Sequence, residues 1–301
     1  MKKLLNIQEL RESYKKGENI SLKLQSDGSL SSEDIIEVSY DLQSGSYTNY
    51  VLSNIERANA YALELAQLLD EHLDENDIML DIGTGEMTTL TLMLSQLKRS
   101  PRLVLAFDIS WSRIYVGKKF VEKYSKFDNE KVLPFVAEME HLPCADNSID
   151  VVTSSHALEP NGGKLESILR ELFRVTRKKL VLFEPSYENN SKEGKARMDK
   201  FGYIKNLADI VESLGGQVLS TTQLHNIANP LNPTYCYVVS VDAARASDDQ
   251  DFSFSVPGVS TPLFLKDSFY FSEQMGVSFP IIDKIPVLKN SAAILTSALR
   301  I

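Results

Sequence analysis

The chain has 301 residues, of which 43% are hydrophobic and 24% charged, and its formal net charge is −9. This length can form one large α/β domain with a smaller appendage, and the acidic balance argues against a nucleic-acid partner, since phosphates would meet net repulsion. Two isolated cysteines, Cys144 and Cys236, and the lack of a long apolar run argue against a disulfide framework, a metal site and a membrane partner, so we expect a cytoplasmic protein.

Residues 1–54 are expected to form an N-terminal lid or cap. No element is assigned before Leu30, because charge and short apolar patches alternate there without a period. A helix is predicted after Ser32, which we take as its N-cap. The following stretch, YDLQSGSYTNY, crowds polar and aromatic groups around one glycine. It indicates either a surface loop packed on the domain or a lid whose substrate-binding candidates are Tyr40, Gln43 and Tyr47.

An amphipathic helix is predicted over Ile55–Leu73. The segment Ile78–Leu94, IMLDIGTGEMTTLTLML, then indicates a strand, a tight turn and a helix. Gly83 and Gly85 let the backbone approach a ligand closely, and the helix start offers unpaired N–H groups. We therefore predict a cofactor-binding turn, of a kind that NAD enzymes also contain.

Two further strands end in acids. Arg102–Asp108 places a carboxylate where it can accept hydrogen bonds from both ribose hydroxyls of an adenosine, and Val132–Glu138 follows. A loop, HLPCADNSIDVV, leads into the fourth strand, Ile149–Ser155. The NAD pattern fits less well, because Thr88 stands at its third glycine and that pattern does not call for this loop.

These segments resemble the class I S-adenosylmethionine-dependent methyltransferases: DIGTGE their first motif, FDIS their second, and AEMEHLPCADNSIDVV their third and fourth. The resemblance implies a Rossmann-like α/β fold, with a seven-stranded sheet, helices on both faces and a reversed last strand. It implies S-adenosylmethionine as cofactor. Met87 departs from the pattern, because a glycine is common there. The residues that the resemblance assigns to the cofactor are Asp81, Gly83, Thr84 and Gly85 around the methionine part, Asp108 and Ile109 at the ribose, Glu138 and Met139 at the adenine, and Ser155.

The catalytic candidates follow two neighbouring strands, since ligands of open α/β sheets bind outside the carboxyl ends of the strands. His156 and Glu159 follow the fourth strand, and Glu184 follows the fifth, Lys179–Phe183. His156 could remove a proton near neutral pH, or it could be a satisfied structural donor. The two carboxylates could equally bind a cationic or hydroxylated substrate. Tyr187 is a further substrate-binding candidate.

The domain is expected to extend over residues 55–242, closing with a helical stretch over 195–216 and strands at Gln217–Leu224 and Tyr235–Asp242. Residues 243–251 are small and polar, which indicates a linker. The tail, 252–301, resembles a Trm112-like zinc ribbon through its DKIPVL ending. Ser255 and Gly258 stand where that ribbon has its first cysteine pair, and the tail has no Cys or His. We therefore predict a metal-free β module that either covers the substrate or mediates a subunit contact.

The resulting hypothesis is a methyltransferase that aligns a small-molecule acceptor, such as a sugar-type intermediate, with an electrophilic methyl group. A non-catalytic scaffold that acts through a protein partner is one alternative. RNA methylation is another, suggested by the Trm112 resemblance but disfavoured by the acidic balance and by SSHALEPN, which stands in place of an Asn-Pro-Pro-Tyr type motif. A homo-oligomer is compatible with the sequence.

Overall fold

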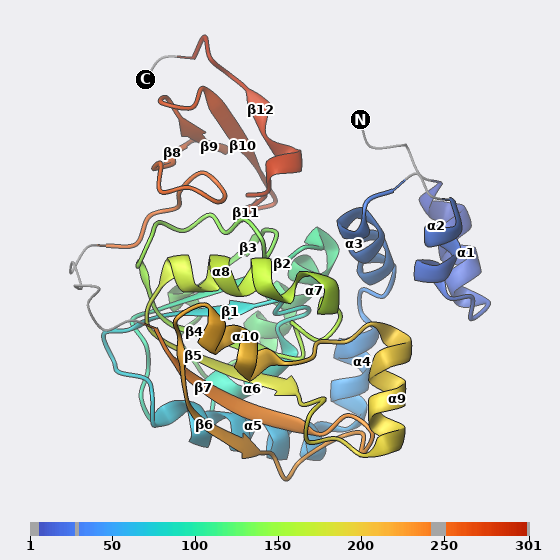
Figure 1. Cartoon of the computed structure of the whole chain (residues 1–301). Coiled ribbons are helices and arrows are strands. Elements are labelled where there is room, and N and C mark those ends of the chain that lie inside the picture. The colour runs from blue at the N-terminus through green and yellow to red at the C-terminus, as the bar shows by residue number, and fades with distance from the viewer. Residues whose placement is uncertain (1–5, 28–29, 242–250, 300–301) are drawn as a thin grey trace.

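A seven-stranded sheet forms the centre of the molecule, in a computed structural model that describes residues 6–27, 30–241 and 251–299 (Figure 1). Its strand order is β3-β2-β1-β4-β5-β7-β6. All neighbouring strands are parallel except at β7, which runs antiparallel to both β5 and β6. The predicted sheet and its reversed last strand are therefore confirmed. The strands are β1 (Ile78–Ile82), β2 (Leu103–Asp108), β3 (Val132–Val136), β4 (Ile149–Ser155), β5 (Thr176–Pro185), β6 (Gln217–Gln223) and β7 (Thr234–Ser240).

Helices cover both faces of this sheet, which explains why its central strands read as continuous apolar runs. Every residue of β1 is buried. One hydrophobic cluster packs α5, α6 and α7 on one face, and a second packs α8 and α10 on the other (Figure 1). The helices of this layer are α5 (Ile55–Asp70), α6 (Thr88–Leu94), α7 (Trp111–Tyr124), α8 (Leu165–Val175), α9 (Lys192–Phe201) and α10 (Leu207–Ser213).

The N-terminal cap is helical, including segments for which the sequence pattern indicates a loop or no element at all. Its helices are α1 (Ile7–Lys15), α2 (Ile20–Asp27), α3 (Ser32–Leu42) and α4 (Ser46–Ser53). The N-cap of α3 is Ser31, whose side chain accepts from the Asp34 N–H, so the prediction of Ser32 was wrong by one residue. The helical conformation is interrupted between α3 and α4 at Gly45, whose φ is +94°. Glycine adopts this backbone conformation without strain.

The predicted helical stretch over 195–216 is also divided. It contains the end of α9 and all of α10, with Gly202 in a left-handed conformation as the C-cap of α9. Left-handed glycines end helices because they lack the Cβ that would clash. Among the described residues, none of the helices has both the length and the apolar character needed to cross a membrane.

The C-terminal residues form a separate small antiparallel sheet, as expected from the sequence (Figure 1). We call residues 251–299 the C-terminal module. Its strands are β8 (Phe264–Lys266), β9 (Phe269–Ser272), β10 (Val277–Ile282), β11 (Ile285–Pro286) and β12 (Ile294–Leu295). Phe254 and Phe279 belong to the same hydrophobic cluster as the large sheet. The predicted linker lies outside the described residues, apart from Asp251.

Candidate functional site

A cavity of about 610 Å³ lies at the carboxyl ends of β1, β2 and β4. Asp81, Gly83, Asp108 and Ser155 line it from the sheet side. Tyr40 and Tyr47 line it from the cap. The predicted cofactor residues Thr84, Ile109, Glu138 and Met139 also line the cavity. Segments distant in the sequence thus meet at the edge of the sheet where ligands of open α/β folds bind.

The glycine-rich turn after β1 leaves no room for larger side chains. A Cβ on Gly83 would lie 2.7 Å from the Ala157 Cβ and 2.8 Å from the Met139 Cε. Met87, where the methyltransferase pattern commonly has glycine, adopts φ +50° and is fully buried. The position thus has the left-handed backbone conformation that glycine adopts more easily, although methionine stands there.

Asp81, the last polar group before this turn, is almost completely buried. Burial raises the pKa of its carboxyl to about 7, while the Thr84 hydroxyl acts in the opposite direction. A carboxylate is costly to ionise in such a place unless a cation compensates it. The site is therefore suited to a ligand that brings a positive charge to Asp81.

Asp108 ties the turn to α7. Its Oδ2 accepts from the Gly85 N–H at 3.0 Å and from Arg113 Nη1 at 3.3 Å, and its Oδ1 accepts from the Ser110 N–H at 2.9 Å. Burial raises the pKa of Asp108, although Arg113 and the backbone donors counteract it. Asp108 also lines the cavity, where a ligand hydroxyl can meet its carboxylate.

Arg113, which pairs with Asp108, also contacts the cap. Its guanidinium lies 5.0 Å from the ring centroid of Tyr40 and 4.9 Å from that of Tyr47. A Cβ on Gly85 would fall 2.2 Å from Arg113 Nη2, so Gly85 faces this side chain. Cation–π contacts of this kind hold the cap tyrosines over the site.

Glu86 is a site residue that the sequence analysis missed. Its carboxylate is 1% exposed and accepts from the Gly45 N–H at 2.9 Å and from the Thr48 N–H and hydroxyl at 2.8 and 2.6 Å. It thereby caps the N-terminus of α4 from the glycine-rich turn. The only signal for this role in the sequence is the position of an acidic residue directly after the glycines. Its partners could not be predicted, because they lie about 40 positions earlier in the chain.

His156 lines the cavity with both ring nitrogens already bonded. Nδ1 lies 2.6 Å from Glu159 Oε2, and Nε2 lies 2.8 Å from Thr234 Oγ1. Burial alone would lower the pKa of His156, but the hydrogen bond and charge of Glu159 outweigh it and raise the pKa. His156 also has φ +57°, which is uncommon for a bulky residue. Of the two roles considered for His156, the satisfied donor fits this geometry better than the base.

The two predicted catalytic carboxylates hold the turn after β4 and do not line this cavity. Glu184 is fully buried and accepts from the backbone N–H groups of Ala157, Leu158 and Glu159 at 2.9, 3.0 and 3.2 Å. Burial raises its pKa to about 7. Glu159 accepts from Asn232 Nδ2 at 3.0 Å in addition to His156. Both carboxylates are therefore placed to position His156 and its turn, and their catalytic role stays a prediction.

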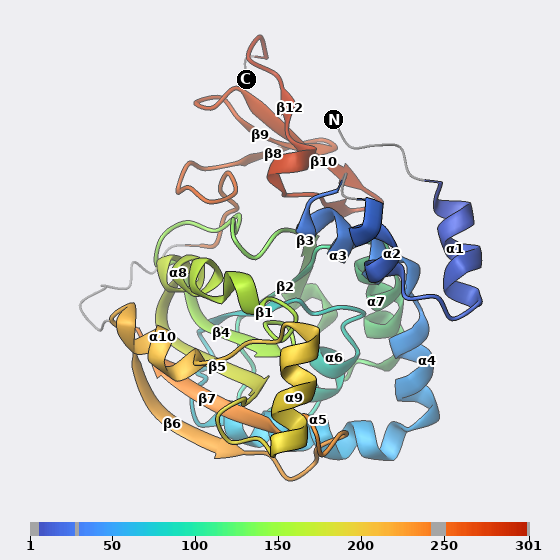
Figure 2. The same ribbon diagram turned by 45° about the vertical axis from the view of Figure 1, so that its right-hand side comes forward.

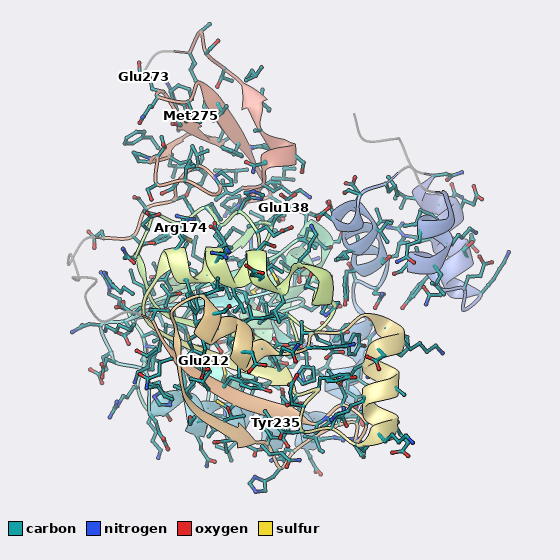
Figure 3. The ribbon with its side chains drawn as sticks, viewed as in Figure 1. Glu138, Arg174, Glu212, Tyr235, Glu273 and Met275 are labelled. Atoms are coloured by element: carbon teal, nitrogen blue, oxygen red, sulfur yellow. The ribbon has the colours of Figure 1, made fainter. Side chains whose placement is uncertain are left out.

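Two of the four predicted substrate residues also lie away from the cavity. The Gln43 side chain donates to the Ser39 carbonyl at the end of α3, and the Tyr187 hydroxyl lies 3.3 Å from Asp199 Oδ2. Their positions in the sequence suggested that both residues line the ligand cavity. Because the cap is helical, the Gln43 side chain instead bonds to the backbone of α3. The sequence also left open whether the tail covers the substrate. Asn290 and Ser291 of the C-terminal module line the cavity beside Glu138, which Figure 3 labels at this junction.

Residues 80–183 match the family model of the methyltransferase domain. Among solved structures, the chain resembles a chain of the Haloferax volcanii complex that contains the methyltransferase activator Trm112, with 14% identity, a TM-score of 0.52, and coverage of 67% of this chain and 97% of that chain. It also resembles magnesium protoporphyrin IX methyltransferase from Synechocystis PCC 6803 with bound SAH, with 13% identity, a TM-score of 0.47, and coverage of 62% and 84%. A SAM dependent methyltransferase from Aquifex aeolicus shows 18% identity, a TM-score of 0.44, and coverage of 60% and 92%. No curated protein matches the sequence.

Proposed function

We propose that this chain is an S-adenosylmethionine-dependent methyltransferase, which its domain match and its fold support, and that it methylates a small molecule that binds beneath the N-terminal cap. The observation that carries this proposal is the cavity of about 610 Å³, bounded by the glycine-rich turn on one side and by Tyr40 and Tyr47 on the other. Its volume lies in the range typical of sites for small ligands.

The residues of the turn fit the cofactor. Gly83 lets the turn pack closely against Ala157 and Met139 at the cavity wall, and the buried Asp81 would gain from the positive amino group of the methionine part. We assign Asp108 to the ribose and Glu138 with Met139 to the adenine. When bound, S-adenosylmethionine supplies a methyl carbon that its sulfonium makes electrophilic. The remaining work of the chain is to orient the acceptor and to exclude water.

The cavity wall carries charges of both signs. Glu33, Asp34, Glu37, Glu138 and Glu140 line it together with Lys164 and Arg113, and Glu33, Glu37 and Glu140 are paired with Lys164 or Lys289. What disfavours the RNA alternative is therefore the net charge of the whole chain, −9, which repels phosphates. Sugar-type acceptors remain our preferred class, because hydroxyl groups could bond to Tyr40, Tyr47 and Asn161, which share the same cavity.

One observation favours a second candidate function, a scaffold that binds a protein partner. Several large apolar side chains of the C-terminal module are exposed, namely Phe264, Leu265, Met275, Ile294 and Leu295. Exposed apolar patches commonly mark interaction sites. The Trm112-like character of this module would fit such a contact and remains part of this proposal.

Methyl transfer can be tested by incubating the purified chain with S-adenosylmethionine carrying a labelled methyl group and fractions of polar metabolites. We expect label in a small hydroxyl- or amine-bearing product. Replacing Gly83 by Val should abolish that product, because the new side chain would collide with Ala157 and Met139 and distort the turn. Labelling of added RNA instead would support the RNA alternative. Binding of the cofactor with no labelled product, together with a stable protein partner, would support the scaffold.

A further inference from the structure

The N-terminal cap is attached to the rest of the molecule partly through polar contacts. The buried apolar side chains of α1–α3, namely Leu10, Ile20, Leu24, Ile35 and Leu42, form a cluster of their own. Val51 of α4 instead belongs to a cluster that packs against the large sheet. Burial of apolar surface therefore holds α1–α3 to one another and α4 to the sheet, and polar contacts help to fix α3 over the cavity.

One face of α3 supplies such interactions. Glu33, Glu37 and Asp41 recur every four residues, so they share one side of the helix. Each meets a partner from a different part of the chain. Glu33 pairs with Lys164, which also pairs with Glu140 at 2.5 Å. The Asp41 carboxylate accepts from the Ser110 hydroxyl at 3.0 Å.

Glu37 pairs with Lys289 of the C-terminal module, with 2.6 Å between Oε1 and Nζ. Lys289 is 5% exposed. A buried ammonium group is unfavourable without an opposite charge, so Glu37 compensates Lys289 while the cap is closed, and removal of either partner leaves the other uncompensated there. Figure 2 shows α3 next to the C-terminal module, where this pair joins the two ends of the chain.

The backbone that carries Lys289 is itself fixed to the large sheet. Val287 forms a parallel bridge with Val136, and the Leu288 N–H donates to the Val136 carbonyl at 2.8 Å. The next two residues, Asn290 and Ser291, line the cavity. The position of Lys289 is thus set by the same strand, β3, that leads to the proposed adenine residues.

We propose that Lys289 is a positioning residue: with Lys164 it clasps the acidic face of α3 and holds the cap closed over the cavity, so that ligand exchange requires this clasp to open. The C-terminal module then acts on the site within its own chain. The identity of the exchanging ligand rests on the proposed function. The clasp itself does not, because the cap can be followed without any ligand.

The test is hydrogen exchange of the α3 backbone amides in the full-length chain without ligand. Lys289→Met keeps the side-chain volume but removes the charge, and we expect α3 to exchange at least about tenfold faster, since local opening becomes more favourable. Lys266→Met, on β8 of the same module, is the matched control and should leave α3 unchanged. Combining Glu37→Lys with Lys289→Glu should restore protection relative to either single change, which a merely destabilised module would not do.

Unchanged exchange of α3 in a folded Lys289→Met protein would overturn the clasp. If that variant does not fold, Glu37→Gln carries the same test from the cap side, with unchanged exchange again counting against the proposal. The dissociation rate of S-adenosylhomocysteine should rise in parallel with α3 exchange. Failure of the wild-type chain to bind that ligand, with α3 exchange still sensitive to Lys289, would instead refute the proposed function and leave the clasp intact.

Discussion

The Glu86 carboxylate accepts hydrogen bonds from both the backbone N–H and the hydroxyl of Thr48, at 2.8 and 2.6 Å. Glu86 belongs to the glycine-rich turn and Thr48 to the first turn of α4, so this contact couples the cofactor turn to the cap. A change on either side is therefore expected to affect the other.

Glu86→Ala should weaken both folding and cofactor binding. It removes a helix cap and leaves buried N–H groups without a partner, which together correspond to about 1–3 kcal/mol of unfolding free energy. Urea unfolding measures this loss, and calorimetry with S-adenosylhomocysteine measures the second effect. Glu122→Ala, at an exposed position of α7, is the control. Full stability of Glu86→Ala would show that α4 does not depend on the turn.

Asp81 should give cofactor binding a pH dependence. Its pKa is raised to about 7 by burial, so the affinity for S-adenosylhomocysteine should increase between about pH 6 and pH 8 as the carboxylate ionises and can pair with the ligand amine. Asp81→Asn should bind about tenfold more weakly at the upper pH and lose this dependence. Calorimetry across that range makes the comparison, with exposed Asp209→Asn as the control. An affinity that is flat with pH in the wild type would contradict the assignment.

The same group affects the stability of the ligand-free protein. The folded state keeps the Asp81 proton up to about pH 7, whereas an aspartate in an unfolded chain has an ordinary pKa of about 3.9. The folded state therefore binds more protons than the unfolded chain in this interval, and its contribution to stability falls as pH rises through it. Asp81→Asn should make the unfolding free energy, measured by urea unfolding, less dependent on pH there.

His156 should titrate above its ordinary value because of Glu159. Glu159→Gln removes the negative charge that raises the pKa of His156. Burial then dominates, so the pKa of His156 should fall. Proton NMR of the imidazole resonances follows this directly. In the wild type, the charged pair adds stability that is complete below the unfolded pKa of about 6.5 and is lost as pH rises through the raised pKa. A pKa that does not respond to Glu159→Gln would refute the pairing.

Glu184→Gln distinguishes positioning from catalysis. An amide offers one acceptor oxygen where the carboxylate has two, so at least one backbone N–H of the turn at 157–159 loses its partner, at a cost of about 1–3 kcal/mol. We expect a lower melting temperature together with lower turnover. Loss of turnover at an unchanged melting temperature would instead favour the catalytic role predicted from the sequence.

The sequence was most informative where strands are buried on both faces. The bounds of β4 were predicted without error, with Asp146, Asn147 and Ser148 as a turn signal directly before the strand. Contacts between distant segments could not be predicted. Glu86 finds its partners at Gly45 and Thr48, and Ser291 reaches the cavity from near the end of the chain. Such pairs depend on how the cap and the C-terminal module pack, which no local periodicity encodes.

The central claim, that the glycine-rich turn binds S-adenosylmethionine, is tested most directly by titrating the purified full-length chain with S-adenosylmethionine and S-adenosylhomocysteine in a calorimeter, with NAD as control. We predict binding of both at about micromolar affinity and none of NAD, and at least about tenfold weaker binding to Asp108→Ala, which lacks the proposed ribose acceptor. Absence of binding by a folded wild-type chain, or equal affinity in Asp108→Ala, would contradict the account.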